Sequence, residues 1–439
     1  MSKGARPTRA RHVTLGFILG LTAVAYLDRV CIATAAPAIR AELGLSDAQL
    51  GYVFSAFTLA YALFEVPSGW LADRFGARLM LTRIVVWWSF MTAATGLAAG
   101  FASLFALRLL FGIGEAGAFP GTARAFSHWL PAHERGRAFG LAVMSGALGG
   151  ALTQPLVVML LGRMSWRHAF QIFGVVGLLW AVAWWSWFRD DPRRHRGVNE
   201  AELRLIGMDP PQPHGAVPWR QMLRSRNLHA LCLMYGCAIY GWYFYLTWLP
   251  TYLLRARGFN LNQVGWLAAL PLLSIAAGVL AGGWISDRLL RVRPPRVARR
   301  LPGVIGLPLA AAAVLGAVAT TRPLAAALLL AAAAGLAALG VAPAWAVCLE
   351  VGGRSAGVVS GAMNTFGNLG GALSPVVVGL CLERGGAWGA PLVSVAALYA
   401  VAALCWWVID PARPLQAAAA APAGAGADAG GVTEVEAGL

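Results

Sequence analysis

Long apolar runs separated by short polar segments dominate this chain. We identify twelve of them, at residues 13–37, 48–71, 79–99, 102–125, 137–161, 168–188, 228–253, 264–286, 301–320, 323–349, 356–382 and 390–409. A helix needs about 20 mostly apolar residues to cross a bilayer, and within lipid a helix satisfies its own backbone hydrogen bonds. The period-two alternation of a transmembrane β-barrel is absent from the sequence. The pattern therefore predicts an all-α membrane protein with twelve transmembrane helices.

A short phrase occurs twice, each time at the end of an apolar run. Its two copies are Gly69-Trp70-Leu71-Ala72-Asp73-Arg74 and Gly283-Trp284-Ile285-Ser286-Asp287-Arg288. The copies stand close to half a chain length apart, which indicates a duplicated unit. We therefore expect two six-helix bundles related by pseudo-twofold symmetry.

The polar segments divide the chain into five parts. We expect a cytoplasmic N-terminal arm at 1–12, an N-terminal bundle at 13–188 and a C-terminal bundle at 228–410. Between the bundles, residues 189–227 are rich in Pro and Arg and form a predicted cytoplasmic linker with one short amphipathic helix near 199–206. Residues 411–439 are rich in Ala, Gly and Pro, so a disordered tail is predicted.

Composition supports a membrane protein and argues against other classes. The chain is 58% hydrophobic and 12% charged, whereas soluble domains are roughly 25% charged. The net charge is +16, and most Lys and Arg lie in the N-terminal arm, the even-numbered loops and the tail. This asymmetry places both termini in the cytoplasm of a bacterial inner membrane and explains the charge without a nucleic-acid partner. The six Cys and seven His show no metal-ligand spacing, and we predict no cofactor.

Four charged residues lie deep within the first and fourth apolar runs. Asp28 and Arg29 lie in the first run, and Arg108 and Glu115 share one face of the fourth. An ionisable group at this depth costs on the order of 2.5 kcal/mol or more. Either these residues neutralise one another in two ion pairs, or they line an aqueous cavity. In the second case Arg29 and Arg108 suit an anionic substrate, and Asp28 and Glu115 can exchange protons.

Further polar and aromatic residues extend this candidate site. Tyr61 carries a hydroxyl one turn before Glu65, which is either a packing partner or a second proton site. Tyr235 belongs to an aromatic cluster in the seventh run, which either faces lipid or lines a pocket. Asn364 lies among glycines in the eleventh run and is a candidate reader of substrate hydroxyls.

The repeated phrase has a different predicted role, because it follows the end of a helix at the cytoplasmic side. We interpret it as a latch that closes in one conformation of the protein and opens in another. Its candidate residues are Gly69, Asp73, Arg74, Arg78 and Asp287, with the segment 134–137 as a candidate partner.

The phrase Gly69-x-Leu71-x-Asp73-Arg74-x-Gly76-x-Arg78 resembles the loop signature of the major facilitator superfamily. Within it the chain resembles the anion:cation symporter family of organic-anion carriers, over about residues 12–412. The resemblance is carried by 26–29, 108–115 with Pro120, 198–202, 246–252 and 363–368. It implies inverted repeats within each bundle and a midplane site between the bundles.

The same resemblance implies roles for individual residues. Positions that match Asp28 and Glu115 are implicated in proton coupling, and those that match Arg29, Tyr61, Arg108 and Asn364 in holding the anion. Glu65 stands where sugar-acid members commonly carry a glutamine, and Tyr235 where some carry a polar amide. Both departures leave open an aromatic carboxylate in place of a polyhydroxylated substrate.

We therefore predict a proton-coupled symporter that imports a small organic anion by alternating access. The alternatives are a proton-coupled exporter of drugs or metabolites and a transporter-like membrane sensor. An enzyme is disfavoured, because the sequence shows no nucleophile–base pair or metal cluster. The expected partners are the anion, protons and the lipid bilayer, with one chain as the functional unit.

Overall fold

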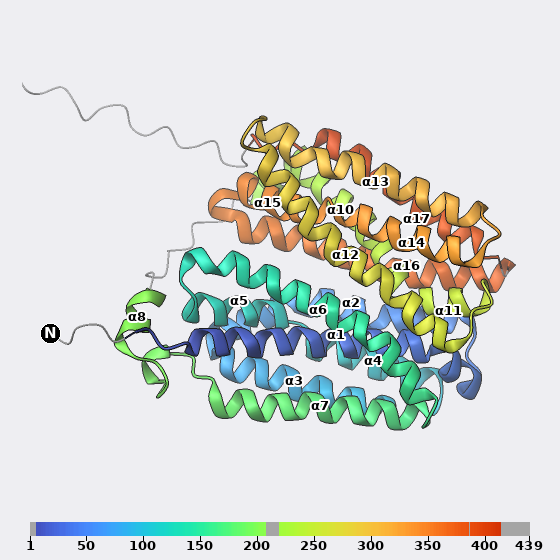
Figure 1. Ribbon diagram of the computed structural model, residues 1–439, viewed down its shortest axis with the longest axis horizontal. Helices are drawn as coiled ribbons and strands as arrows, with labels where there is room; N and C mark the ends of the chain where they lie inside the picture. Colours follow the sequence, from blue (N-terminus) through green and yellow to red (C-terminus); the bar gives the residue numbers. More distant parts are fainter. Residues whose placement is uncertain (1–5, 208–218, 386, 414–439) are drawn as a thin grey trace, which may run out of the picture.

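The computed structural model describes residues 6–207, 219–385 and 387–413. Throughout these ranges the regular structure is helical, without a strand. The helices form two groups that lie side by side in Figure 1, one from the first half of the chain and one from the second. The C-terminal tail beyond residue 413, for which disorder is predicted, lies outside the described residues.

The N-terminal half contributes seven helices to the first group. They are α1 (Ala10–Leu43), α2 (Asp47–Phe75), α3 (Ala77–Thr95), α4 (Phe101–Glu115), α5 (Ala118–Trp129), α6 (Ala132–Leu161) and α7 (Trp166–Trp187). The predicted fourth run is a single span that is broken into α4 and α5. A 3₁₀ turn (Pro192–Arg194) and the short helices α8 (Glu200–Ile206) and α9 (Trp219–Arg224) follow in the linker.

The C-terminal half repeats this arrangement. Its helices are α10 (Arg226–Thr247), α11 (Leu249–Arg255), α12 (Leu261–Leu289), α13 (Pro295–Ala319), α14 (Pro323–Ala338), α15 (Val341–Gly352), α16 (Ala356–Gly385) and α17 (Gly389–Val408). A 3₁₀ turn (Gly353–Ser355) precedes α16. Here α14 and α15 together make one span, as α4 and α5 do in the first half. Ten of the twelve predicted spans are long and apolar enough to cross a bilayer, and α2 and α3 are the other two helices.

The repeat seen in the sequence extends over the whole of α2 and α12. Each helix begins with a capping box, made by Ser46 with Gln49 and by Asn260 with Gln263. In such a box a side chain and a backbone N–H bond reciprocally and fix where the helix starts. Both helices end in the repeated Gly-Trp phrase. Helices α2 and α12 therefore begin and end at matching positions of the repeat.

The two halves meet along helices that the repeat relates. Helix α2 packs on α16, and α12 packs on α6. A Cβ on Gly51 of α2 would lie 2.4 Å from the carbonyl oxygen of Pro375, and one on Gly265 of α12 would lie 3.2 Å from the Cα of Pro155. Small residues allow helices to approach this closely in a membrane. Two glycines at matching positions thus form corresponding contacts of a pseudo-twofold interface.

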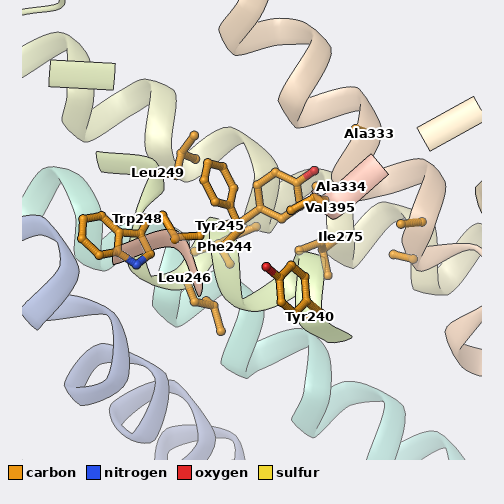
Figure 2. Close-up of a cluster of buried hydrophobic side chains, with 14 of the residues drawn as sticks. Tyr240, Phe244, Tyr245, Leu246, Trp248, Leu249, Ile275, Ala333, Ala334 and Val395 are labelled. Carbon is orange, nitrogen blue, oxygen red and sulfur yellow. The ribbon is translucent and has the colours of Figure 1, made fainter. Parts of the chain in front are cut away.

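Aromatic side chains of α10 fill the core of the second half. Figure 2 shows Tyr240, Phe244, Tyr245 and Trp248 packed among apolar side chains of neighbouring helices. The Tyr240 hydroxyl lies 3.0 Å from the Ser394 oxygen. A lipid-facing belt therefore does not account for these rings, because they are buried inside the protein.

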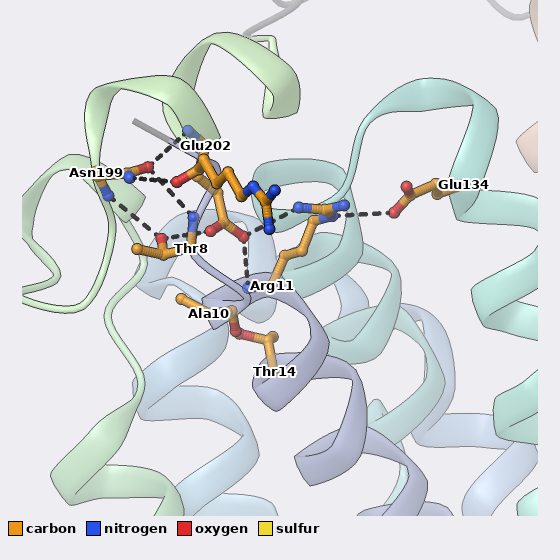
Figure 3. A network of polar contacts seen from close by, with 8 residues as sticks. Thr8, Ala10, Arg11, Thr14, Glu134, Asn199 and Glu202 are labelled. Carbon is orange, nitrogen blue, oxygen red and sulfur yellow. Dashed lines mark hydrogen bonds and ion pairs between the residues drawn. The ribbon is translucent and has the colours of Figure 1, made fainter. Parts of the chain in front are cut away.

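The start of the chain is fastened to the linker by a polar network (Figure 3). The Glu202 carboxylate is fully buried and accepts hydrogen bonds from the Thr8 hydroxyl and from the backbone N–H of Arg11. Arg11 also forms ion pairs with Glu202 at 3.3 Å and with Glu134 at 3.4 Å. The predicted arm is thus structured from residue 6, and α1 already begins at Ala10.

Candidate functional site

The intramembrane charges of α1 and α4 meet in the first half. Arg29 Nε donates to Glu115 Oε1 at 2.6 Å, and the Glu115 side chain is fully buried. Three aromatic rings surround the Arg29 guanidinium, with centroids 5.5 Å (Tyr26), 5.1 Å (Phe57) and 4.8 Å (Tyr61) from its central carbon. A cation over aromatic faces is stabilised by the ring quadrupoles. Arg29 is thus held in place by Glu115 and by the surrounding rings.

A helix break fixes the position of Glu115. Helix α4 ends at Glu115, and Gly117 adopts a left-handed φ of +94° before α5 begins. A Cβ on Gly117 would lie 2.5 Å from the Cβ of Ser68. Glycine is therefore required at this position because a larger residue would be strained at this φ and would collide with Ser68. The carboxyl end of a helix favours a cation. Arg29 therefore balances both the Glu115 carboxylate and the end of α4.

Asp28 and Arg108 are buried beside this pair without a complete set of partners. Neither oxygen of Asp28 has a hydrogen-bond partner, and the same holds for Glu115 Oε2 and Arg108 Nε. Arg108 Nη2 donates to the Thr95 hydroxyl at 2.9 Å, and its guanidinium lies 4.6 Å from the Phe111 ring centroid. Buried polar groups are nearly always satisfied. Orphaned carboxylate oxygens at this depth therefore mark a place for a proton, water or substrate.

The alternative of two ion pairs among the four charges is only partly present. Arg29 and Glu115 form one ion pair between α1 and α4. Asp28 has no hydrogen bond to Glu115 or to Arg108. Two complete ion pairs would have favoured a purely structural role, and the described residues form one.

Two pockets lie on either side of Arg29. The first is a small pocket lined by α1, α4 and α5 and includes Glu115. The second is also small and includes Arg108 and residues of α10 from the other half, among them Tyr243. Arg29 lines both pockets, so it is shared by the pocket that contains Glu115 and the pocket to which both halves contribute.

A second group of candidate residues joins the two halves. Asn364 Nδ2 of α16 donates to both oxygens of Glu65 on α2, at 2.9 and 2.8 Å, and Asn368 Nδ2 lies 3.4 Å from Glu65 Oε2. Tyr235 packs edge-on against Trp345, whose Nε1 donates to the Tyr235 hydroxyl at 3.3 Å. Glu65 is thus an interhelical partner between bundles.

Sequence reasoning passed over three aromatic residues of this site, Tyr26, Phe57 and Tyr243. Tyr26 precedes Arg29 by three positions and Phe57 precedes Tyr61 by four, so each shares a helix face with a residue that was selected. That spacing was the available signal. Tyr243 was seen as part of an aromatic cluster, and only the packing of α10 on α16 reveals which ring faces Arg29.

The latch candidates of the first half lie at the end that carries the linker. The backbone N–H of Arg78 donates to Asp190 Oδ1 at 3.0 Å, and its guanidinium stacks 4.1 Å from the Trp185 centroid. Arg74 lies over the ring of Trp70, and Gly69 packs on Pro120. The side chain of Asp73 is outside the described part of the structure.

The matching candidate of the second half is Asp287. Its Oδ1 lies 2.9 Å from Arg299, which also binds Glu350 at 2.8 Å. All three residues belong to the C-terminal half. The described contacts of the repeated phrase thus stay within one half each, and a latch between the halves stays a prediction. Across the described ranges, no cluster of His, Cys, Asp and Glu is arranged to hold a metal ion.

Comparison with known proteins places the sequence among transporters. Residues 18–375 match the family model described as Major Facilitator Superfamily. The probable sulfoacetate transporter SauU of Cupriavidus necator is 38% identical, over 92% of this chain and 94% of that protein. The probable galactarate/D-glucarate transporter GudP of Bacillus subtilis is 32% identical, over 93% of each chain. The D-galactonate transporter of Escherichia coli O6:H1 is 33% identical, over 92% of this chain and 96% of that protein.

Solved structures share the fold. A bacterial homologue of the human lysosomal transporter Spinster matches in its inward-facing, unoccupied form with a TM-score of 0.74 and 23% identity, over 92% of this chain and 98% of that one. The occupied form gives a TM-score of 0.73 at 22% identity, over 92% and 97%. The prediction of two bundles of transmembrane helices is confirmed, and so is a transporter in place of an enzyme.

Proposed function

This chain belongs to the Major Facilitator Superfamily, and we propose that it is a proton-coupled symporter that imports a small organic anion by alternating access. The observation that carries the proposal is the aromatic-lined Arg29, bonded to one oxygen of Glu115 while the other oxygen has no partner. The named relatives carry sulfoacetate, galactarate, D-glucarate and D-galactonate, all of them acids. A fixed cation beside a free carboxylate oxygen suits the joint movement of an anion and a proton.

Arg29 and Arg108 hold the anion by charge, since a guanidinium stays protonated at any accessible pH. Tyr61, Tyr235 and Asn364 contribute hydrogen bonds to the rest of the substrate. When the anion binds Arg29, it competes with Glu115 for the same cation. A buried carboxylate without a cation is strongly disfavoured in its charged form, so Glu115, with Asp28 beside it, takes up the coupled proton.

The proposal includes an orientation in the membrane. The linker, the start of α1 and the basic ends of α2 and α3 lie together at one end of the bundles (Figure 1). Because basic loops stay in the cytoplasm, we place this end and both termini inside a bacterial inner membrane. We take one chain as the functional unit.

Uptake into proteoliposomes tests the proposal. The panel contains sulfoacetate, D-glucarate, D-galactonate and benzoate, with galactose as an uncharged control. With an inward proton gradient we expect at least one acid to accumulate and a protonophore to abolish its accumulation. Arg29→Gln should abolish uptake, whereas Arg204→Gln, on an exposed linker side chain, should leave it unchanged. Binding of an acid without its accumulation would indicate a sensor. Accumulation of the acid only when the proton gradient is directed outward would indicate an exporter.

A further inference from the structure

Glu65 is a carboxylate of one bundle that is held by amides of the other. Its two oxygens accept from Asn364 Nδ2 at 2.9 and 2.8 Å, and Asn368 reaches Oε2 at 3.4 Å. Asn364 and Asn368 are one turn apart on α16, so they present a pair of donors on one helix face. The side-chain amides of Asn364 and Asn368 thus form a binding site for a carboxylate, which we call the seat.

This seat belongs to the neighbourhood of Arg29. Glu65 follows Tyr61 by one helical turn on α2, and the Tyr61 ring lies 4.8 Å from the Arg29 guanidinium. The carboxylate of Glu65 therefore lies among the groups to which we assign the substrate.

The direction of α2 shows on which side of Arg29 this bridge lies. Helix α2 runs from Asp47, near α11, to Phe75 at the linker end. Glu65 is one turn, about 5.4 Å, further toward the linker end than Tyr61. The bridge from Glu65 to α16 thus joins the two halves between Arg29 and the linker end.

We propose that Glu65 is a built-in competitor, which occupies the amides of Asn364 and Asn368 in the empty transporter and is displaced by an oxygen-bearing group of the bound acid. The inference rests on the proposed function and adds a determinant of affinity to it. A site that is occupied by its own tethered group binds an external ligand more weakly, in proportion to the fraction of time it is free. Because Glu65 is also a like charge beside the anion, it selects for acids that can outcompete it.

Removal of Glu65 should raise the affinity for the acid, whereas removal of a residue that binds the substrate lowers it. In Glu65→Ala we expect the acid of the panel that wild type binds (sulfoacetate, D-glucarate, D-galactonate or benzoate) to bind roughly tenfold more tightly by titration calorimetry. Glu65→Gln keeps the side-chain length and one acceptor for Asn364 but removes the charge. Its affinity for the acid should therefore lie between the affinities of wild type and of Glu65→Ala. Glu42→Ala is the matched control, since Glu42 bonds to Arg167 far from both pockets.

The amides supply the decisive comparison. In an Asn364→Ala, Asn368→Ala background, Glu65→Ala should no longer tighten binding, because the seat for which Glu65 competes is gone. Unchanged or weaker binding in a folded Glu65→Ala protein overturns the inference, and so does tightening that persists without the two amides. If the alanine variant does not fold, Glu65→Gln carries the same test. A wild type that binds none of the four acids contradicts the proposed function itself, and this inference with it.

Discussion

At the scale of single residues, the proposed proton coupling rests on the two carboxylate oxygens of Glu115. One oxygen holds Arg29 and the other has no partner. Glu115→Gln keeps an acceptor for Arg29 but has no proton to exchange. We expect this variant to exchange substrate across the membrane while losing accumulation driven by pH. One pH unit corresponds to about 1.4 kcal/mol per proton, so about a tenfold gradient of a singly charged acid should be lost.

The measurement is radiolabelled uptake with and without a proton gradient, followed by counterflow. Glu200→Gln, on an exposed side chain of the linker, is the control and should match wild type in both assays. If Glu115→Gln still accumulates substrate in response to pH, Glu115 is not the coupling group and Asp28 becomes the candidate.

The sequence was most informative about residues that are costly in lipid. Asp28, Arg29, Arg108 and Glu115 were selected because each carries charge within an apolar run. Their partners could not be predicted, because helical phase tells which residues share a face and not which neighbouring helix covers it. Arg108 therefore bonds Thr95 of α3, while Glu115 on the same helix bonds Arg29.

At the scale of helices, glycines at chain reversals fix where the elements begin and end. Gly76 separates α2 from α3 with a φ of +86°, and a Cβ there would lie 2.7 Å from an Asp190 carboxylate oxygen. The same carboxylate accepts from the backbone N–H of Arg78. Gly76→Ala should cost roughly 1–3 kcal/mol for a backbone conformation that is essentially restricted to glycine, and the displacement of Asp190 adds to this.

Thermal unfolding in detergent measures this cost. The matched control is Gly136→Ala, because Gly136 lies in helix α6 with open space where a Cβ would be. Alanine favours a helix over glycine, so the control should melt at the wild-type temperature or above it. Equal melting temperatures for both variants would contradict the role of Gly76.

The twelve runs predicted the helices well, since a bilayer leaves little choice of secondary structure. The breaks inside the runs were not predicted. The run at 102–125 reads as continuous, yet the chain ends α4 at Glu115 and restarts at Ala118. A glycine within an apolar run is equally compatible with close helix packing, so Gly117 gave no sign that it takes a left-handed conformation.

At the scale of the whole molecule, the halves are joined at one end and midway. At the α11 end, Asp47 of α2 binds Arg255 at 2.7 Å, and the rings of Phe54 and Trp248 meet edge-on. Glu65 bridges the halves midway. The repeat in the sequence predicted two similar halves, but similarity does not specify which surfaces meet.

We expect the ion pair of Asp47 with Arg255 to influence which side of the transporter is open. Asp47 is buried and binds both terminal nitrogens of Arg255, at 2.7 and 3.3 Å, while Arg40 of its own half lies 3.3 Å away. Asp47→Asn keeps one acceptor but removes the charge that attracts Arg255 across the interface. A partly exposed pair of this kind contributes up to about 1 kcal/mol, which shifts a two-state population by about fivefold.

Spin labels at Ala99 in the first half and Asn262 in the second would report the separation of the halves at this end. In Asp47→Asn we expect the long-distance population to increase about fivefold, because the state that is open at the α11 end no longer loses an ion pair. Asp191→Asn, whose partner Arg194 lies within the linker, should leave the distances unchanged. A distance distribution in Asp47→Asn identical to that control would mean that apolar packing around Trp248 alone closes this end.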